Sequence, residues 1–243
     1  MDVQLRSYKK DFEYSYSLGV FPTLELLDFQ ADKVIKIIIS QNGMENNGII
    51  KILDICRKKN IEVQVNDKAI NRISKKKNCY AVGVFKKYDV NLSHFNNHVV
   101  LVNPSDMGNL GTIIRTIMGF GIKDLGIIKP GVDIYDPKVV RSSMGAVFKL
   151  SFKYFDSFDE YRNSFSHDIY TFMLNAKETI HTVKLNETRP FSLVFGNEGS
   201  GLSDEFLDIG TSVIIPHSNE IDSLNLSIAV GIASYEFTKN QMK

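Results

Sequence analysis

The chain has 243 residues and is 43% hydrophobic, which allows one large domain or two smaller ones with a normal core. Its formal net charge of +1 points to no class of partner. No apolar run approaches the roughly 20 residues that span a bilayer, and the first residues contain no secretory signal. Cys56 and Cys79 have no histidine at metal-ligand spacing, which predicts buried thiols in a reducing cytoplasm. Neither a membrane segment nor a metal centre is expected.

Helices and strands are predicted to alternate in the first 90 residues, although residues 1–19 show no clear pattern. Pro22 suits the first turn of a helix, and Asn46 or Asn47 suits the cap of another. Apolar spacing predicts helices over 21–28, 48–59 and 66–73 and strands over 34–39, 61–65 and 80–85. This order indicates a small α/β sandwich over 1–90, followed by a polar linker at 91–97.

Charge is distributed unevenly along the chain. Residues 1–97 hold 16 Lys and Arg against 11 Asp and Glu, whereas the remaining residues hold 13 against 17. A basic front half is typical of a nucleic-acid-binding domain joined to a domain that binds a small molecule. The alternative is an ordinary solvated surface rich in lysine. The candidates for phosphate contact are Arg57, Lys58, Lys59, Arg72, Lys75, Lys76, Lys77 and Arg141.

From residue 98 onward the alternation of strands and helices resumes. Strands are predicted over 99–102, 125–128, 168–174, 191–195 and 213–215, and helices over 109–119, 136–143, 157–164 and 223–238. Such alternation predicts an α/β domain with a parallel sheet that is covered by helices on both faces.

Three polar turns in this half follow predicted strands. The first, at 103–109, contains Pro104, Ser105, Asp106, Gly108 and Asn109. The second, at 196–201, reads Gly-Asn-Glu-Gly-Ser-Gly, and the third leads from residue 216 to Ser-Leu-Asn at 223–225. Open α/β sheets bind ligands at the carboxyl ends of their strands, so these turns are the candidate site.

In this order, the three turns resemble the SpoU/TrmH branch of the SPOUT methyltransferases, which methylates the ribose 2′-hydroxyl of RNA. The matching residues are Asn109, Gly111 and Arg115, then Gly196, Glu198, Gly199, Gly201 and Leu202, then Pro216, Ser223, Leu224, Asn225 and Ser227. The resemblance implies a SPOUT catalytic domain over 98–243 with a deep C-terminal trefoil knot. It also implies that residues 1–90 form a ribosomal-protein-like RNA-binding domain.

The resemblance further implies S-adenosylmethionine as the cofactor and a catalytic group of Asn109, Arg115, Glu198, Ser223 and Asn225. Because a guanidinium stays protonated, we expect Arg115 to clamp an RNA phosphate and support a developing alkoxide. Glu198 is expected to fix Arg115 or Asn225. The structural alternatives are a surface salt bridge for Arg115, an exposed turn carboxylate for Glu198, and helix capping for the other three.

The implied cofactor-binding residues surround the second and third turns. They are Phe195, Gly196, Asn197, Gly199, Gly201, Ile215, Pro216, Ser223 and Leu224. Glycines in the second turn are expected to let main-chain amides approach the cofactor, since glycine has no Cβ and accepts positive φ. The glycine spacing does not match the Gly-x-Gly-x-x-Gly dinucleotide fingerprint, so a nicotinamide cofactor is disfavoured. Met107, Met144 and His217 stand where relatives often carry Pro, Ala and Met, which bears on target choice.

The sequence thus predicts a cytoplasmic RNA 2′-O-ribose methyltransferase that forms a homodimer through its C-terminal domain. Ribosomal RNA is the expected substrate, and transfer RNA is the alternative. Two other functions stay open, namely a non-catalytic RNA-binding or assembly factor that keeps the fold, and a SPOUT enzyme that modifies a base nitrogen.

Overall fold

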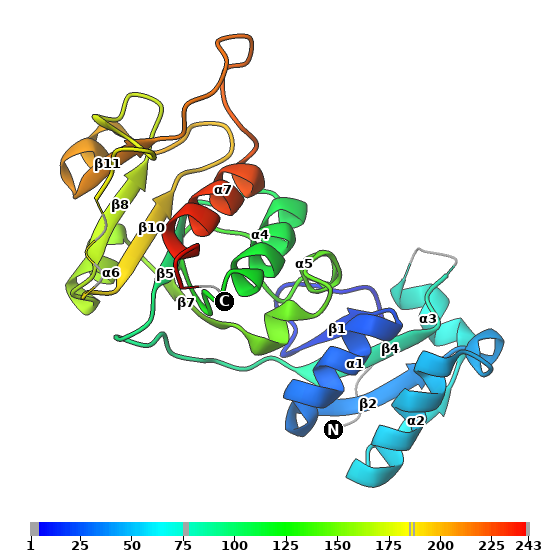
Figure 1. Ribbon diagram of the computed structural model, residues 1–243. Helices are drawn as coiled ribbons and strands as arrows, with labels where there is room; N and C mark the ends of the chain where they lie inside the picture. Colours follow the sequence, from blue (N-terminus) through cyan, green and yellow to red (C-terminus); the bar gives the residue numbers. More distant parts are fainter. Residues whose placement is uncertain (1–4, 75–77, 185, 187, 242–243) are drawn as a thin grey trace. The chain divides into compact units, whose positions relative to one another are not determined.

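The computed structural model describes residues 5–74, 78–184, 186 and 188–241, and the chain forms two compact units (Figure 1). The front unit comprises residues 1–88 and 133–149, and the rear unit comprises 89–132 and 150–243. The division therefore differs from the predicted boundaries of 1–90, 91–97 and 98–243. Segment 133–149 lies inside the predicted catalytic domain, yet it packs with the front unit.

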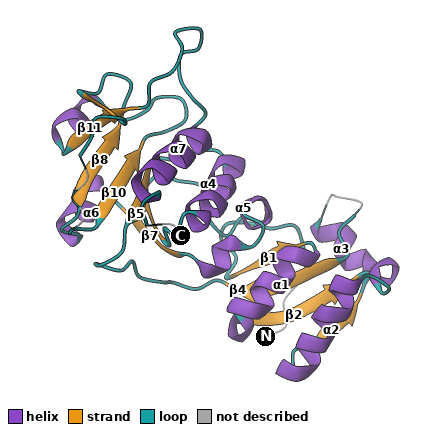
Figure 2. Ribbon diagram, viewed as in Figure 1, coloured by secondary structure: helices purple, strands orange, loops and turns teal. Residues whose placement is uncertain are grey.

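The front unit contains a mixed four-stranded sheet, and three helices of residues 5–74 pack with it (Figure 2). The strands run in the order β1 (Tyr14–Leu18), β4 (Ala81–Lys86), β2 (Val34–Ile39) and β3 (Val63–Val65). Strand β4 is antiparallel to both of its neighbours, and β2 and β3 are parallel. The helices are α1 (Val20–Phe29), α2 (Asn47–Lys59) and α3 (Asp67–Ile73).

The predicted elements of the front unit are confirmed, and β1 is the strand that the sequence did not reveal. This stretch showed no clear pattern because its serines alternate with larger residues, yet Ser15 and Ser17 are fully buried. Their hydroxyls are satisfied, because Ser15 donates to the Tyr135 carbonyl at 2.5 Å and Ser17 pairs with the Thr23 hydroxyl at 2.9 Å. Hydrogen-bonded serines therefore interrupt the apolar pattern without leaving the core. Asn46 caps α2, as expected, by accepting from the Gly48 amide at 2.8 Å.

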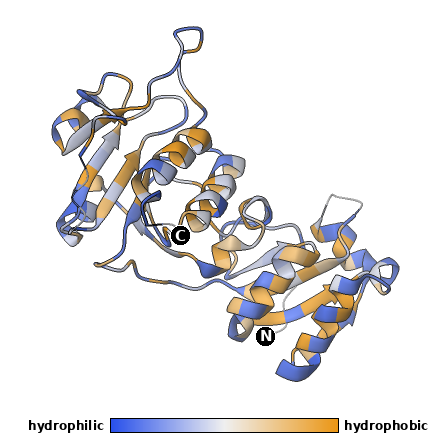
Figure 3. Ribbon diagram, viewed as in Figure 1, coloured by the Kyte–Doolittle hydropathy of each residue, from blue (hydrophilic) through white to orange (hydrophobic). Residues whose placement is uncertain are grey.

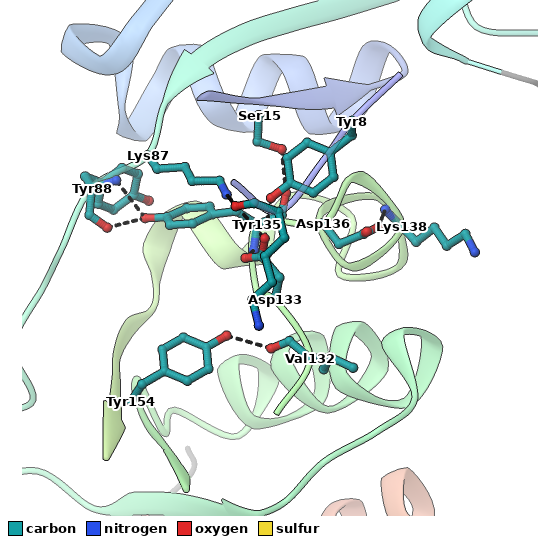
Figure 4. Close-up of polar contacts among 11 residues, drawn as sticks. Tyr8, Ser15, Lys87, Tyr88, Val132, Asp133, Tyr135, Asp136, Lys138 and Tyr154 are labelled. Carbon is teal, nitrogen blue, oxygen red and sulfur yellow. Dashed lines mark hydrogen bonds and ion pairs between the residues drawn. The ribbon is translucent and has the colours of Figure 1, made fainter. Parts of the chain in front are cut away.

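Segment 133–149, which includes α5 (Pro137–Ser142), completes the front unit through polar and aromatic contacts. Figure 4 shows how its polar side chains meet residues at the ends of β1 and β4. The Tyr135 hydroxyl donates to the Tyr88 carbonyl at 2.5 Å, and Asp133 accepts from Tyr8 and from Lys87. This segment is therefore part of the front unit's core rather than a connection within the rear one.

The rear unit contains a seven-stranded sheet in which every recorded strand pair is parallel. The order is β7 (Ser151–Phe155), β6 (Asp124–Ile128), β5 (His98–Val102), β10 (Phe191–Phe195), β8 (Asp168–Phe172), β11 (Thr211–Ile214) and β9 (Glu178–Thr179). The predicted parallel sheet is confirmed, and β7 and the two-residue β9 are additional strands.

Helices cover both faces of this sheet, as the alternation predicted. They are α4 (Met107–Gly119), α6 (Phe158–Ser164) and α7 (Leu226–Thr238). On the fully buried strand β10, which Figure 3 colours as hydrophobic, Val194 belongs to the core cluster that includes α6, and Phe191 contacts Phe237 of α7. Helices α4 and α7 lie side by side (Figure 1). Within the described part of the chain, no helix is long and apolar enough to span a membrane.

Candidate active site

A cavity of about 350 Å³ lies at the carboxyl ends of β8, β10 and β11 in the rear unit. Its walls come from the residues that follow these three strands and from the first turn of α7. Leu226 and Ala229 of α7 and Phe195 of β10 provide apolar surface, and the turn at 196–202 provides main-chain polar groups. This is the edge at which parallel sheets bind ligands, and the volume suits a small molecule.

The carboxylate of Glu198 joins the second polar turn to the first. One oxygen accepts from the Ser105 amide at 3.0 Å and from the Ser105 hydroxyl at 2.8 Å. The other accepts from the Asp106 amide at 3.1 Å and from the Asn109 side chain at 3.4 Å. Burial by itself would raise the pKa of Glu198, but these hydrogen bonds outweigh it, so the pKa lies below its ordinary value. Glu198 is thus held as a carboxylate anion.

The first and third turns meet through two asparagines. The Asn225 side-chain amide donates to the Asn109 side-chain oxygen at 3.2 Å. Asn225 also caps α7, because its oxygen accepts from the Ser227 amide at 2.9 Å and the Ser227 hydroxyl at 2.7 Å. Capping and a site contact are therefore both made by this one side chain. Together, Glu198, Asn109 and Asn225 form a continuous line of hydrogen bonds across the three turns.

Two helix starts differ from the prediction. Helix α4 begins at Met107, since Asp106 is the cap and accepts from the Asn109 amide at 2.7 Å. Asn109 is therefore not the cap, and its side chain is available to join Glu198 to Asn225. Helix α7 begins at Leu226 rather than at 223, and Ser223 lies exposed in the preceding loop.

Arg115 does not meet the other predicted catalytic residues. It lies exposed on α4, outside the cavity, and it makes no hydrogen bond or ion pair with any residue that the structure describes. The expectation that Glu198 fixes Arg115 is wrong, because the Glu198 carboxylate is already bound by the first turn. The alternative of a surface salt bridge for Arg115 is likewise not seen within the described ranges. Glu198 reaches Asn225 only indirectly, through Asn109.

Eight of the nine predicted cofactor-binding residues line the cavity. They are Phe195, Gly196, Asn197, Gly199, Gly201, Ile215, Ser223 and Leu224. The exception is Pro216, which is exposed and does not contribute to the wall. Its neighbour His217 does, with Nδ1 placed 2.9 Å from the Ile215 carbonyl.

The turn at 196–201 needs glycine for reasons internal to its backbone. A Cβ on Gly196 would lie 2.1 Å from the Gly201 carbonyl carbon, so the chain closes on itself at this point. Gly201 has a φ of 68°, in the left-handed region. Asn197 stabilises the turn by accepting from the Gly199 amide at 2.9 Å and donating to the Asn103 carbonyl at 2.8 Å.

Two residues of the cavity wall were not predicted from the sequence. Asn175 and Asp204 both line the cavity, and the Asn175 amide donates to the Asp204 carboxylate at 3.1 Å. The missed signal was positional, because residues 173–175 follow a parallel strand at its carboxyl end, as the three polar turns do. Ser105, which gives two hydrogen bonds to Glu198, was noted only as a turn residue.

The predicted RNA-contacting residues lie in the front unit. Arg57, Lys58 and Lys59 lie in the last turn of α2, Arg72 lies in the last turn of α3, and Arg141 lies in α5. Lys58 is paired with Asp54 at 2.7 Å, and Lys59 donates to the Leu27 carbonyl at 3.2 Å. Lys75, Lys76 and Lys77 lie outside the described residues.

The fold of this chain is that of solved RNA methyltransferases. The AdoMet-bound rRNA methyltransferase from Sinorhizobium meliloti has the same fold, with a TM-score of 0.79 at 24% identity over 95% of this chain and 89% of that one. The SpoU rRNA Methylase family model matches residues 96–235, which is more than half of the chain. The protein therefore belongs to the SpoU rRNA methylase family.

Two relatives in this family are similar in sequence. An uncharacterized tRNA/rRNA methyltransferase from Synechocystis sp. is 34% identical over 145 residues, which are 59% of this chain and 53% of that protein. The chain thus matches about half the length of that relative. The 23S rRNA (adenosine(1067)-2′-O)-methyltransferase of Streptomyces azureus is 29% identical over 198 residues, covering 76% of this chain and 73% of the relative.

Proposed function

We propose that this protein transfers the methyl group of S-adenosylmethionine to a ribose 2′-hydroxyl of RNA, with ribosomal RNA as the substrate. The observation that carries the proposal is the line of hydrogen bonds from Glu198 through Asn109 to Asn225, which joins three distant turns beside the cavity. A methyltransferase of this kind must hold an acceptor oxygen in line with the methyl group, and a rigid set of polar side chains serves that purpose.

The cavity residues fit this cofactor. Apolar side chains of Phe195, Leu224 and Leu226 suit an adenine ring, and the main chain of the 196–202 turn suits the polar part of a nucleoside. Serine at 223 adds a hydroxyl at the same wall. The cofactor supplies a methyl group that is already activated on a sulfonium. The protein's contribution is binding, alignment and exclusion of water.

The residues of the line have different roles in the proposed reaction. Glu198 is a positioning residue, because both of its oxygens are bound by the first turn. Asn109 and Asn225 present amide groups at the point where the acceptor ribose approaches. Arg115 has no intramolecular partner among the described residues, so its guanidinium is available for an RNA phosphate and for the charge that develops on the 2′-oxygen.

The proposal includes a homodimer formed through the rear unit. Helix α7 leaves three apolar side chains exposed at helical spacing, namely Ile228 (54%), Ile232 (39%) and Tyr235 (52%). A second copy packed against α7 and its neighbour α4 would cover this stripe and place one chain's Arg115 near an adjoining cavity. The proposal also includes a deep knot. Membership of the SpoU family supports it.

The front unit is proposed to hold structured RNA. Its helix ends carry the basic residues described above, and the Streptomyces azureus match covers more of this chain than the rear unit alone contains. That relative is named as an enzyme of 23S rRNA, which favours ribosomal over transfer RNA. The two thiols are buried, in keeping with the proposed cytoplasmic location.

The test is transfer of a tritiated methyl group onto total RNA from a strain that lacks the protein. Ribosomal and transfer RNA are separated afterwards and digested with a nuclease that needs a free 2′-hydroxyl. If the label is on the ribose, the phosphodiester bond beside the labelled nucleotide resists cleavage. Label on ribose in ribosomal RNA supports the proposal, whereas label on a base nitrogen or on transfer RNA contradicts it. Failure of the protein to bind S-adenosylmethionine in calorimetry would favour the non-catalytic assembly factor.

A further inference from the structure

The cavity carries negative charge that its own walls do not neutralise. Among the described residues that line it, the ionisable groups are Glu198, Asp204 and His217, and none is lysine or arginine. The adjoining segments add further acids, with Glu205 and Asp208 beside Asp204 and with Glu220 and Asp222 before Ser223. The Lys177 ammonium is paired with Asp208 at 2.9 Å. The acidic balance of the second half of the sequence is thus concentrated partly at this cavity.

The two cavity carboxylates are not equivalent. Glu198 is half-buried, and both of its carboxylate oxygens accept hydrogen bonds from the first turn. Asp204 is exposed at the start of the short 3₁₀ helix Asp204–Asp208, and one of its oxygens accepts from Asn175 at 3.1 Å. Its other oxygen has no partner among the described residues. Asp204 is therefore the wall carboxylate that can respond to a charge inside the cavity.

We propose that Asp204 makes the cavity discriminate between the cofactor and its spent form by charge. The inference rests on the proposed function. S-adenosylmethionine carries a sulfonium cation, and S-adenosylhomocysteine, which remains after transfer, is a neutral thioether. In the transfer, the bond from sulfur to methyl breaks with its electron pair staying on sulfur, a carbon–oxygen bond forms between the methyl group and the ribose oxygen, and the hydroxyl proton passes to water. An attraction between a carboxylate of the cavity wall and the sulfonium would therefore exist before the reaction and be absent after it.

The consequence is preferential release of product. A carboxylate near a cation at an exposed site strengthens binding modestly, because water and salt screen the interaction. The same carboxylate has no charge to attract on the sulfur of the neutral thioether. Asp204 therefore raises the affinity for the cofactor relative to its product. The Asn175 contact holds the carboxylate at the cavity wall, between the segments that follow β8 and β10.

Isothermal titration of the full-length protein tests this. The ligands are S-adenosylmethionine, S-adenosylhomocysteine and an analogue with a protonated amine in place of the sulfonium. The Asp204→Asn variant keeps the shape and the acceptor for Asn175. We expect it to bind both cationic ligands about three- to tenfold more weakly and the neutral thioether with unchanged affinity. The difference between wild type and variant should shrink in high salt.

The matched control is Glu205→Gln, which removes a neighbouring exposed carboxylate that contacts Ser203 and does not line the cavity. It should leave all three affinities unchanged. Equal weakening of charged and neutral ligands by Asp204→Asn would overturn the inference, because Asp204 would then contact a part that both share. An effect of Glu205→Gln as large as that of Asp204→Asn would also overturn it. Wild-type protein that binds neither natural ligand would contradict the proposed function itself, and the inference with it.

Discussion

Glu198 and Ser105 are 93 positions apart in the chain, and the Ser105 amide and hydroxyl both donate to one oxygen of the Glu198 carboxylate, at 3.0 and 2.8 Å. The contact ties the glycine-rich turn after β10 to the turn that begins α4. Glu198 also accepts from the Asn109 side chain, whose oxygen accepts from Asn225, so this carboxylate helps to position both asparagines.

Replacing Glu198 with glutamine should loosen the site without unfolding the protein. The glutamine amide group would face N–H donors where the carboxylate accepts them, so at least one charge-assisted hydrogen bond is lost. We expect kcat/KM for methyl transfer to fall by about tenfold or more. Ser105→Ala should lower kcat/KM by a smaller factor, because the main-chain amide of Ser105 still donates to Glu198. Single-turnover kinetics measures both, with Glu205→Gln as the control, and a wild-type rate for Glu198→Gln would refute the positioning role.

Arg115→Ala should abolish turnover and leave the affinity for S-adenosylmethionine within about twofold of wild type. The side chain lies outside the cavity, so its loss removes contacts to RNA and to developing charge rather than to the cofactor. Methyl transfer and calorimetry, measured on the same preparation, separate these effects. Cofactor binding that falls together with turnover would contradict this assignment.

Mixing two inactive variants tests whether the site is shared between subunits. In a dimer that pairs Arg115→Ala with Asn225→Ala, one of the two sites regains both native residues if Arg115 serves the partner's cavity. Random pairing should then restore about a quarter of the wild-type rate. No recovery would show that Arg115 acts on the cavity of its own chain.

Ile232→Asp, which places a charge on the exposed stripe of α7, should give a monomer in light scattering.

A buried chain of hydrogen bonds makes stability depend on pH. His98 lies 2.8 Å from the Tyr161 hydroxyl, which lies 2.6 Å from the Ser192 hydroxyl, and His167 lies 2.9 Å from the same serine. Burial, with the neighbouring His167, lowers the pKa of His98 to about 3, and burial also lowers the pKa of His167. Both histidines are therefore neutral in the folded protein and protonate more readily when it unfolds.

Acid should therefore destabilise the folded protein. Between about pH 6.5 and about pH 3 the unfolded chain binds more protons, so stability is complete above this window and falls as the pH drops through it. Protonation of His98 in the unfolded chain should by itself lower the free energy of unfolding by about 2 kcal/mol between pH 7 and pH 5. Urea unfolding at several pH values measures the loss. His98→Gln should flatten the pH dependence, whereas the exposed His181→Gln should not, and parallel curves for all three proteins would contradict the assignment.

The front unit should fold only when segment 133–149 is present. Tyr135 and Phe148 place their rings 5.8 and 5.1 Å from that of Phe85, and Val139 and Val140 are fully buried. A fragment of residues 1–90 would expose this part of its core to water. We expect it to aggregate or melt without cooperativity, whereas residues 1–88 joined to 133–149 by a flexible linker should melt sharply in circular dichroism. A cooperative transition in the 1–90 fragment would contradict the division into units.

Much of this protein follows from local sequence. Apolar periodicity and turn residues located nearly every helix and strand, because those signals depend on neighbours within a few positions. The three polar turns with Asn109, Glu198 and Asn225 indicated the site and the family, since each turn lies next to a recognisable strand. One miss also had a local origin. The buried serines of β1 gave a polar pattern to a core strand.

Only the tertiary structure decided which distant groups meet. Glu198 binds the Ser105 turn instead of Arg115 because β10 pairs directly with β5, which brings the two turns to the same end of adjacent strands. Segment 133–149 joins the front unit because its aromatic rings match a surface made by strands 50 or more positions earlier. Strand order and long-range packing are properties of the whole chain, and no window of neighbouring residues encodes them.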